Sequence, residues 1–412
     1  MNLIKQKFTS LSNRNFRIFW MLEIFSLLGV WIQSTSQWWL VYKLTDSPFL
    51  LGLVSAVQFL PVLLFSLFAG VIVDNFEKRK VLLITQSLLC FLAFVLGIFV
   101  VLGIALYWHI LIFALILGIV NTFDMPARQS IILDFVDKED LMNAVALNSS
   151  VFNVARMVGP AVAGILMRYM DIGYCFIITA FLYIPIVLFL FKVRTKNNSK
   201  NGIDINSILY DVGSGIKHIL SKEILYVTIF LVMIMGIFSL NYSVFVPVLA
   251  KYVLKMESRG FGSLMAAVGL GAFLGSMFVS LRKKREPSIT IIMFSLTTIT
   301  IVLILSGYIS SFVGAVVLLF LTGFFNNIFF TNANSMLMLN ANDEFRGRIM
   351  SIYTLAFSGT SPIGNLLSGT IIDKFSVRSA FLFCGFSILI ITTVFLAIHS
   401  FSKLPKSSRE QI

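Results

Sequence analysis

Residues 16–42 read FRIFWMLEIFSLLGVWIQSTSQWWLVY, an apolar run long enough for an α-helix to cross the hydrocarbon core of a membrane. Eleven similar runs follow it: 49–73, 80–103, 107–130, 141–168, 173–192, 223–250, 259–281, 288–309, 312–338, 346–371 and 379–400. In lipid every backbone N–H and C=O must be paired inside the protein, which a helix achieves alone. In a chain with 58% hydrophobic residues, these runs predict an all-α membrane protein with twelve transmembrane helices.

Basic residues are distributed unevenly over the segments that connect the runs. Most of the 32 Lys and Arg lie before the first run, after the last run and on every second connection. Basic loops stay on the cytoplasmic side of a membrane, so we expect both termini in the cytoplasm. The net charge of +13 then reflects topology and requires no nucleic-acid partner.

The connection at residues 193–222 is long and polar, and it separates two sets of six runs. We therefore expect an N-terminal six-helix bundle at 1–192, a cytoplasmic linker at 193–222 and a C-terminal six-helix bundle at 223–412, related by pseudo-twofold symmetry. Within the linker, apolar residues recur at three- and four-residue steps from Ile205 to Leu220. This spacing predicts an amphipathic helix on the inner membrane surface.

The two sets of runs share a spacing of glycines. Gly159 and Gly164 in the fifth run match Gly364 and Gly369 in the eleventh, at the same offset along the chain. This match favours a duplicated chain, although glycine pairs are also common wherever membrane helices pack.

Polar side chains recur on one face of the first, fourth, seventh and tenth runs. Polar residues are costly in lipid and tend to face a cavity, which favours a water-filled path shared by these helices. The alternative is that each side chain only hydrogen-bonds a neighbouring helix. The residues expected to line a substrate cavity are Gln33, Gln37, Asn121, Asn153, Asn241, Tyr242, Asn327, Thr331 and Asn334.

Four ionisable residues within the runs are candidates for the transport path: Glu23, Asp124, Arg128 and Arg156. Glu23 is the carboxylate best placed to take up and release a proton. Asp124 and Arg128 lie one helical turn apart near the inner end of their run, which predicts an inner gate pair. Pro126 between them is expected to break or kink the helix.

Arg156 lies too far from both ends of its run for its side chain to reach either surface easily. It therefore needs a partner, and three are open: Glu23, Asp124 and an anionic substrate. A static buried ion pair explains the residue as well as a substrate site does.

No pattern in the sequence predicts an enzyme or a metal site. A glycine-rich phosphate loop and a nucleophile elbow are both missing, and His109, His218 and His399 are too scattered for a metal site. We expect no catalytic activity, no metal and no cofactor.

The loop after the second run, Gly70-Val-Ile-Val-Asp74-Asn75-Phe-Glu77-Lys78-Arg79-Lys80, resembles the G-x-x-x-D-R-x-G-R-K signature of the major facilitator superfamily. Asn75 and Glu77 stand where the signature has Arg and Gly. The resemblance implies that Gly70 permits close helix packing and that Asp74 faces the positive N-terminus of the eleventh helix. Gly70, Asp74, Lys78 and Arg79 are thereby implied as gating residues.

The fifth run contains Arg156-Met-Val-Gly159-Pro160-Ala-Val-Ala-Gly164, which is similar to the antiporter motif of exporters in this superfamily. The resemblance implies that Gly159, Pro160 and Gly164 let helices pack tightly while substrate and proton alternate. Further stretches resemble the subgroup of enterobactin-type siderophore exporters and macrolide efflux pumps: Phe16-Arg-Ile-Phe-Trp20, Gly29-x-Trp31, Trp39-Leu-Val-Tyr42, Asp124-Met-Pro126-Ala-Arg128-Gln129, Leu141-Met-Asn143-Ala144 and Phe345-Arg346-Gly-Arg348. Arg346 and Arg348 are implied as gating residues through the last of these.

The resemblance implies a proton-coupled secondary active exporter of a small molecule, working by alternating access in the inner or only membrane of a bacterium. We expect a siderophore as the substrate, because Arg128 and Arg156 suit an anionic chelator. The many Phe and Met side chains would equally suit a macrolide or another drug. The alternative from another class is a membrane sensor or scaffold that does not transport. The proton gradient would supply the energy, the lipid bilayer and protons would be the partners besides the substrate, and we expect a monomer.

Overall fold

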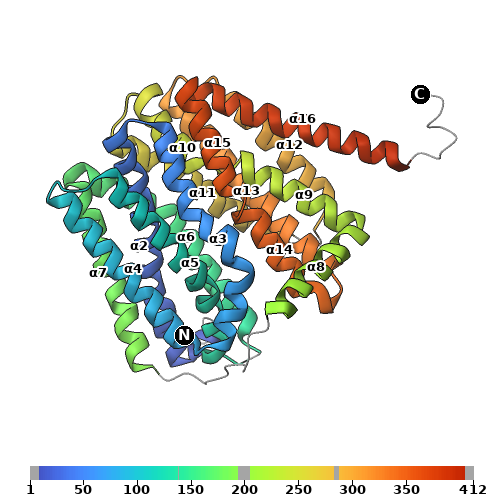
Figure 1. The fold of residues 1–412 in the computed structure, drawn as a ribbon, viewed down its shortest axis with the longest axis horizontal. Helices are drawn as coiled ribbons and strands as arrows, with labels where there is room; N and C mark the ends of the chain where they lie inside the picture. Colours follow the sequence, from blue (N-terminus) through green and yellow to red (C-terminus); the bar gives the residue numbers. More distant parts are fainter. Residues whose placement is uncertain (1–8, 138, 194–204, 283–286, 404–412) are drawn as a thin grey trace.

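The computed structural model describes residues 9–137, 139–193, 205–282 and 287–403, and this part of the chain is helical and contains no strand (Figure 1). Eleven segments are long and apolar enough to cross a membrane: α2 (Arg14–Thr45), α3 (Pro48–Asn75), α4 (Lys78–Val101), α5 (Tyr107–Phe135), α6 (Leu141–Tyr169), α7 (Ile172–Lys192), α9 with α10 (Glu223–Val253), α11 (Ser258–Leu281), α12 (Ile289–Ser306), α13 (Phe312–Asn340) and α16 (Val377–Lys403). The twelfth predicted segment consists of α14 (Arg346–Ser358) and α15 (Ser361–Lys374), each too short to cross alone. The expected all-α membrane architecture is confirmed.

The helices form two groups, which we call the N-terminal half (α2–α7) and the C-terminal half (α9–α16). Figure 1 shows the two halves side by side, with α3 lying next to α15 at their boundary. We call the end of the molecule where α2 begins and α3 ends the basic end, and the other the opposite end. These terms describe the structure without assuming which end faces the cytoplasm.

A short turn connects α2 to α3 at the opposite end. Asp46 has a left-handed conformation, with φ of 51°, and its N–H donates to the carbonyl oxygen of Tyr42 at 3.0 Å. Ser47 then caps α3 by accepting from the N–H of Leu50 at 3.2 Å, and Pro48 occupies the first position of that helix. Such caps pair N–H groups that have no partner inside the helix. The turn therefore holds the Asp46 side chain at a defined place on the molecular surface.

Glycines bring the two halves together at the opposite end. A Cβ added at Gly164 in α6 would lie 2.7 Å from the Cα of Gly262 in α11. A Cβ added at Gly52 in α3 would lie 2.6 Å from the carbonyl oxygen of Asn365 in α15. Larger residues would hold these backbones apart, so the small residues permit the close approach.

Polar side chains tie the same end together in a set that we call the latch: Asp46, Ser47, Lys251 and Asp373. Lys251 forms an ion pair with Asp46 at 2.5 Å, and Ser47 donates to Asp373 at 3.2 Å. Both contacts cross between the halves. The hydrogen bond from Lys251 holds the pKa of Asp46 below its ordinary value.

The halves separate towards the basic end. The backbone of α6 still touches α11 at Met157, because a Cβ added at Gly269 would lie 2.5 Å from the Met157 Cα. On the same face of α6, nearer the basic end, Ser150 is exposed and Met142 is 86% exposed. A Cβ added at Gly70 would meet nothing within 4 Å, so the close packing expected of Gly70 is absent in this conformation. The molecule is closed at the opposite end and open at the basic end.

Two spans that the sequence predicts as continuous are interrupted where they cross. The span 223–250 breaks between α9 (Glu223–Phe238) and α10 (Tyr242–Val248), and 346–371 breaks between α14 and α15. Any Cβ added at Gly236 would overlap the side chain of Thr360, and one at Gly364 would overlap the backbone of α9. Glycines therefore permit the two broken helices to cross in contact.

The linker contains the expected amphipathic helix, α8 (Ile205–Ser221), but the helix packs against protein. Arg348 at the start of α14 donates to Ser214 at 2.7 Å, and the His218 ring stacks on Phe345 with centroids 4.4 Å apart. Lys222 then donates to Asn342 at 2.7 Å. These contacts correct the expectation of a helix resting only on the membrane surface, because they anchor α8 to the C-terminal half.

Candidate functional site

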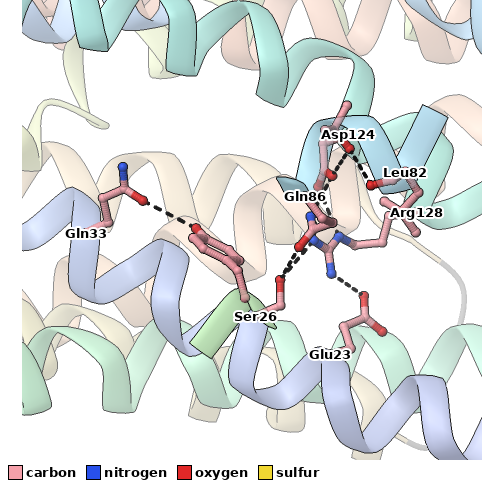
Figure 2. A network of polar contacts seen from close by, with 9 residues as sticks. Glu23, Ser26, Gln33, Leu82, Gln86, Asp124 and Arg128 are labelled. Carbon is pink, nitrogen blue, oxygen red and sulfur yellow. Dashed lines mark hydrogen bonds and ion pairs between the residues drawn. The ribbon is translucent and has the colours of Figure 1, made fainter. Parts of the chain in front are cut away.

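A buried ionic cluster joins helices of the N-terminal half (Figure 2). Arg128 of α5 donates from Nη1 to Glu23 Oε1 of α2 at 3.3 Å and from Nη2 to Asp124 Oδ2 at 3.0 Å. The exposed fractions of Glu23, Asp124 and Arg128 are 0%, 3% and 3%. The expected pair of Asp124 and Arg128 is therefore present, with Glu23 as a third member. The α5 helix continues to Phe135, so the expected break at Pro126 does not occur.

Neighbouring polar groups complete the network around the cluster. Asp124 Oδ1 accepts from Thr85 at 2.6 Å and from Gln86 at 2.7 Å, both on α4. Ser26 donates to Gln86 at 2.9 Å and accepts from Arg128 Nη2 at 3.2 Å. A buried network with its donors and acceptors paired is rigid, and losing one member leaves another unpaired. The cluster therefore fixes the relative positions of α2, α4 and α5.

The charges in this cluster do not balance. Two carboxylates meet one guanidinium, which leaves one negative charge in excess when all three groups are ionised. Glu23 also accepts from the amide of Asn148 in α6, when that amide is oriented with its nitrogen towards the carboxylate. Within the described residues no second cation pairs with Glu23. A proton on Glu23 would neutralise the excess charge and remove an acceptor from Asn148.

Arg156 of α6 pairs with neither of the two protein partners that the sequence allowed. Glu23 and Asp124 both pair with Arg128, and no carboxylate in the described ranges forms an ion pair with Arg156. The guanidinium instead lies over the ring of Trp31 in α2, 5.7 Å from the ring centroid. Of the three open partners, two are therefore excluded in this conformation.

Three residues expected to line the substrate cavity are buried in helix packing. Gln33, Gln37 and Asn241 are 3%, 1% and 1% exposed. Gln33 accepts from the Tyr183 hydroxyl at 3.4 Å, and Gln37 donates to Gln58 at 3.2 Å. Asn241, in the break between α9 and α10, donates from its side-chain amide to the carbonyl oxygen of Ile237 near the end of α9 at 2.7 Å. These contacts correct the expectation of a water-lined face at these positions, where the side chains bond neighbouring groups instead.

Tyr242 is a fourth buried member of the set, and the remaining five are partly exposed. Tyr242 is 8% exposed and accepts from Asn326 of α13 at 2.6 Å. Thr331 donates to Asn327 at 3.3 Å along α13. The partly exposed members of the set are Asn121, Asn153, Asn327, Thr331 and Asn334.

The loop that resembles the superfamily signature has an internal ion-pair set. Glu77, one of its departures, pairs with Arg79 at 3.0 Å and with Lys80 at 2.9 Å. The hydrogen bond from Lys80 holds the pKa of Glu77 below its ordinary value. Arg79 also donates to the carbonyl oxygen of Val193 at 2.8 Å, and Lys78 begins α4. The expectation for Asp74 concerns a side chain outside the described part of the chain.

The antiporter-like stretch of α6 shapes the contacts around Arg156. A Cβ at Gly159 would overlap the Trp31 side chain, so this glycine makes room for the ring that covers the guanidinium. Pro160 lies beside Gly262 of α11, where an added Cβ would be 2.9 Å from the Pro160 carbonyl oxygen. In the C-terminal half, Arg346 donates to the carbonyl oxygen of Met338 at 3.1 Å.

Sequence reasoning missed several members of these networks: Thr85, Gln86, Asn148 and Asn326. Thr85 and Gln86 are adjacent polar residues in an otherwise apolar run. Polar residues of this kind predicted the cavity-lining faces of the other runs, so the same reasoning could have found these two. The sequence predicts Asn327 as a cavity residue, whereas the structure buries its neighbour Asn326 between Ser239 and Tyr242. Only the helix rotation distinguishes these two neighbours.

Secondary transporters typically consist of two helical halves that meet at one end and part at the other, with charged side chains inside the membrane. The chain belongs to the family described as transmembrane secretion effector, whose model matches residues 5–412. It is thus a transmembrane transporter of the major facilitator superfamily for small molecules.

Two bacterial transporters are similar to this chain over nearly its whole length. The Staphyloferrin A transporter of Staphylococcus aureus is 27% identical over 392 residues, which covers 92% of this chain and 94% of that protein. Macrolide efflux protein A of Streptococcus pyogenes is 22% identical over 404 residues, covering 94% and 97%. The crystal structure of the nucleoside transporter NupG matches with a TM-score of 0.74 and 12% identity, over 95% of this chain and all of that one. At that identity the last match shows the fold alone.

Proposed function

We propose that this protein is a proton-coupled exporter in the inner or only membrane of a bacterium, with its basic end in the cytoplasm. The observation that carries the proposal is the cluster of Glu23, Asp124 and Arg128, in which one buried carboxylate exceeds the available positive charge. Such a site accepts a proton readily, because protonation removes an uncompensated charge from a medium of low dielectric constant.

In the proposed cycle, substrate enters between the halves from the basic end while Glu23 is ionised. The ionised carboxylate holds Arg128 and the amide of Asn148, which links α2 to α6. After the substrate leaves at the opposite end, a proton from that side neutralises Glu23. Arg128 then keeps Asp124 alone as its partner, and the link to α6 weakens. The neutral carboxyl permits return to the conformation described here, in which the basic end is open, and release of the proton there restores the contacts of Glu23 with Arg128 and Asn148.

The test is the variant Glu23→Gln in reconstituted vesicles. We expect substrate flux driven by a pH gradient to fall at least about tenfold, because the amide cannot carry a proton. Exchange of substrate across the membrane without a gradient should persist, because that reaction needs no proton transfer. Glu257→Gln is the matched control, since Glu257 is exposed at the opposite end. Flux in Glu23→Gln that still follows the pH gradient as in the wild type would refute the assignment.

We propose a siderophore as the substrate. Its support is the similarity to the Staphyloferrin A transporter along 392 residues and the absence of a carboxylate partner for Arg156 in the described ranges. The second candidate is a macrolide, supported by the similarity to Macrolide efflux protein A. Vesicle flux with a panel of siderophores and macrolides distinguishes the two. A sensor or scaffold would show no flux with any member of the panel.

A further inference from the structure

We infer that Arg156 and Trp31, together with the hydroxyl of Tyr242, form a binding subsite for a carboxylate group of the transported molecule. The inference rests on the proposed function and adds the chemical class of the ligand and the residues that hold it. Its three members come from α6 and α2 of the N-terminal half and α10 of the C-terminal half.

The position of Arg156 is the first argument. Its backbone lies at a close contact between the halves, since a Cβ at Gly269 of α11 would be 2.6 Å from the Arg156 carbonyl oxygen. Towards the basic end, the same face of α6 is exposed at Ser150 and Met142. The Arg156 side chain, which is itself partly exposed, therefore lies between the contact of α6 with α11 and the exposed part of the same helix face. A ligand entering from the basic end would stop at this point.

The chemistry of the guanidinium is the second argument. In the described ranges Arg156 has no carboxylate partner, although an arginine within a membrane protein normally pairs with one. The Trp31 ring covers one face of the guanidinium and leaves its planar edge, which suits two parallel hydrogen bonds to a carboxylate. The Trp31 indole N–H also has no acceptor within the described part. Both groups are donors, so their shared ligand is an anion.

Tyr242 supplies a third donor from the other half. Its hydroxyl oxygen accepts from Asn326 at 2.6 Å, which leaves the hydroxyl proton for a ligand. Tyr242 begins α10, which packs against α2, the helix of Trp31, and against α11, the helix that contacts the Arg156 backbone. A carboxylate bound to both would bridge the halves at the point where they must move apart during transport. Substrates with a carboxylate therefore bind to both halves, while neutral analogues lose this bridge.

The test is direct binding of citrate and of trimethyl citrate to the detergent-solubilised full-length protein, measured by calorimetry. We expect citrate to bind and its ester to bind at least about tenfold more weakly, the effect of losing charge-assisted hydrogen bonds. Arg156→Gln should weaken citrate binding about tenfold or more, and Tyr242→Phe should weaken it less. Arg156→Lys should retain part of the affinity, which shows that the variant site is intact.

Arg168→Gln is the matched control, because Arg168 lies on the same helix and also over an aromatic ring, with its Cζ 5.3 Å from the Tyr169 centroid. Citrate binding that is equal in wild type and Arg156→Gln, or lowered equally by Arg168→Gln, overturns the inference, as does equal binding of the ester. Binding needs no proton gradient. Loss of gradient-driven flux with intact Arg156-dependent binding therefore separates the two claims, and so does gradient-driven macrolide flux without citrate binding.

Discussion

At the scale of single residues, Arg128 determines the state of the buried cluster. It is the cation shared by Glu23 and Asp124, and it also bonds Ser26. Removing one partner of a buried ion pair is far more harmful than removing all of it, because a charge is left uncompensated. The cluster therefore stabilises the fold only as a complete set.

We expect Arg128→Gln to lower the free energy of unfolding by about 3–5 kcal/mol, because two carboxylates then lie buried without a cation. The triple variant with Glu23→Gln and Asp124→Asn should recover most of that loss, since it buries no charge. Thermal unfolding in detergent, followed by tryptophan fluorescence, measures both. A single variant as stable as the wild type would show that the carboxylates are already neutral.

Residue-level prediction from the sequence succeeded where partners are local. Asp124 and Arg128 share a helix face one turn apart, so their pairing follows from helical geometry alone. The sequence does not predict the partner of Arg156, because the choice between Glu23, Asp124 and an external anion depends on how α2, α5 and α6 are rotated against each other. Rotation is a tertiary property that no local spacing encodes.

At the scale of helices, glycines determine at which end of the molecule the two halves can be in contact. The contact between Gly164 and Gly262 holds α6 against α11 at the opposite end only. A branched side chain at this point would force the backbones apart there. The basic end has no such contact at Gly70, so the same substitution has no equivalent effect on it.

Gly164→Leu is therefore expected to shift the population towards molecules that are open at the opposite end. The measurement is the distance between spin labels on cysteines introduced at Tyr169 and Tyr308, which are 74% and 71% exposed. Gly347→Leu is the control, because a Cβ at Gly347 meets nothing within 4 Å. An unchanged distance distribution in Gly164→Leu would contradict the role of this contact.

The latch gives a second prediction for the same pair of labels. The pKa of Asp46 is lowered in the closed conformation, so its ion pair stabilises that conformation above the ordinary carboxylate pKa of about 4. The stabilisation is lost as the pH falls through the lowered pKa. Asp46→Asn should therefore increase the open fraction relative to the wild type at each pH from about 8 to 5, and the two proteins should become alike below the lowered pKa of Asp46. Equal open fractions in Asp46→Asn and the wild type at neutral pH would show that this ion pair does not control closure.

Helix-level prediction was accurate for continuous apolar spans and missed their interruptions. The breaks near Ser239 and at Gly359–Thr360 fall in short polar stretches inside spans that the sequence predicts as continuous. Both breaks lie where the two broken spans cross. Gly236 and Gly364 allow the crossing helices to come into contact there. The sequence also could not predict the contacts of α8, because an amphipathic pattern does not distinguish a helix on a lipid surface from a helix on a protein surface.

At the scale of the whole molecule, the sequence predicted the all-α membrane architecture, and hydropathy alone suffices for that. The conformation could not be predicted. Gly164 and Gly70 look alike in the sequence, yet one is in tight contact and the other faces open space. Which glycines are in contact depends on the relative tilt of the two halves, and a transporter samples more than one tilt.

The latch also has a consequence for the medium that bathes the opposite end. The Lys251 and Asp46 side chains are 39% and 56% exposed, so dissolved ions reach the pair. Raising the salt from about 0.01 M to 1 M shortens the screening length from about 30 Å to about 3 Å and weakens attraction between exposed charges. The fraction of molecules closed at the opposite end would therefore differ between a cell in concentrated salt and a cell in fresh water, with no change in the protein's sequence.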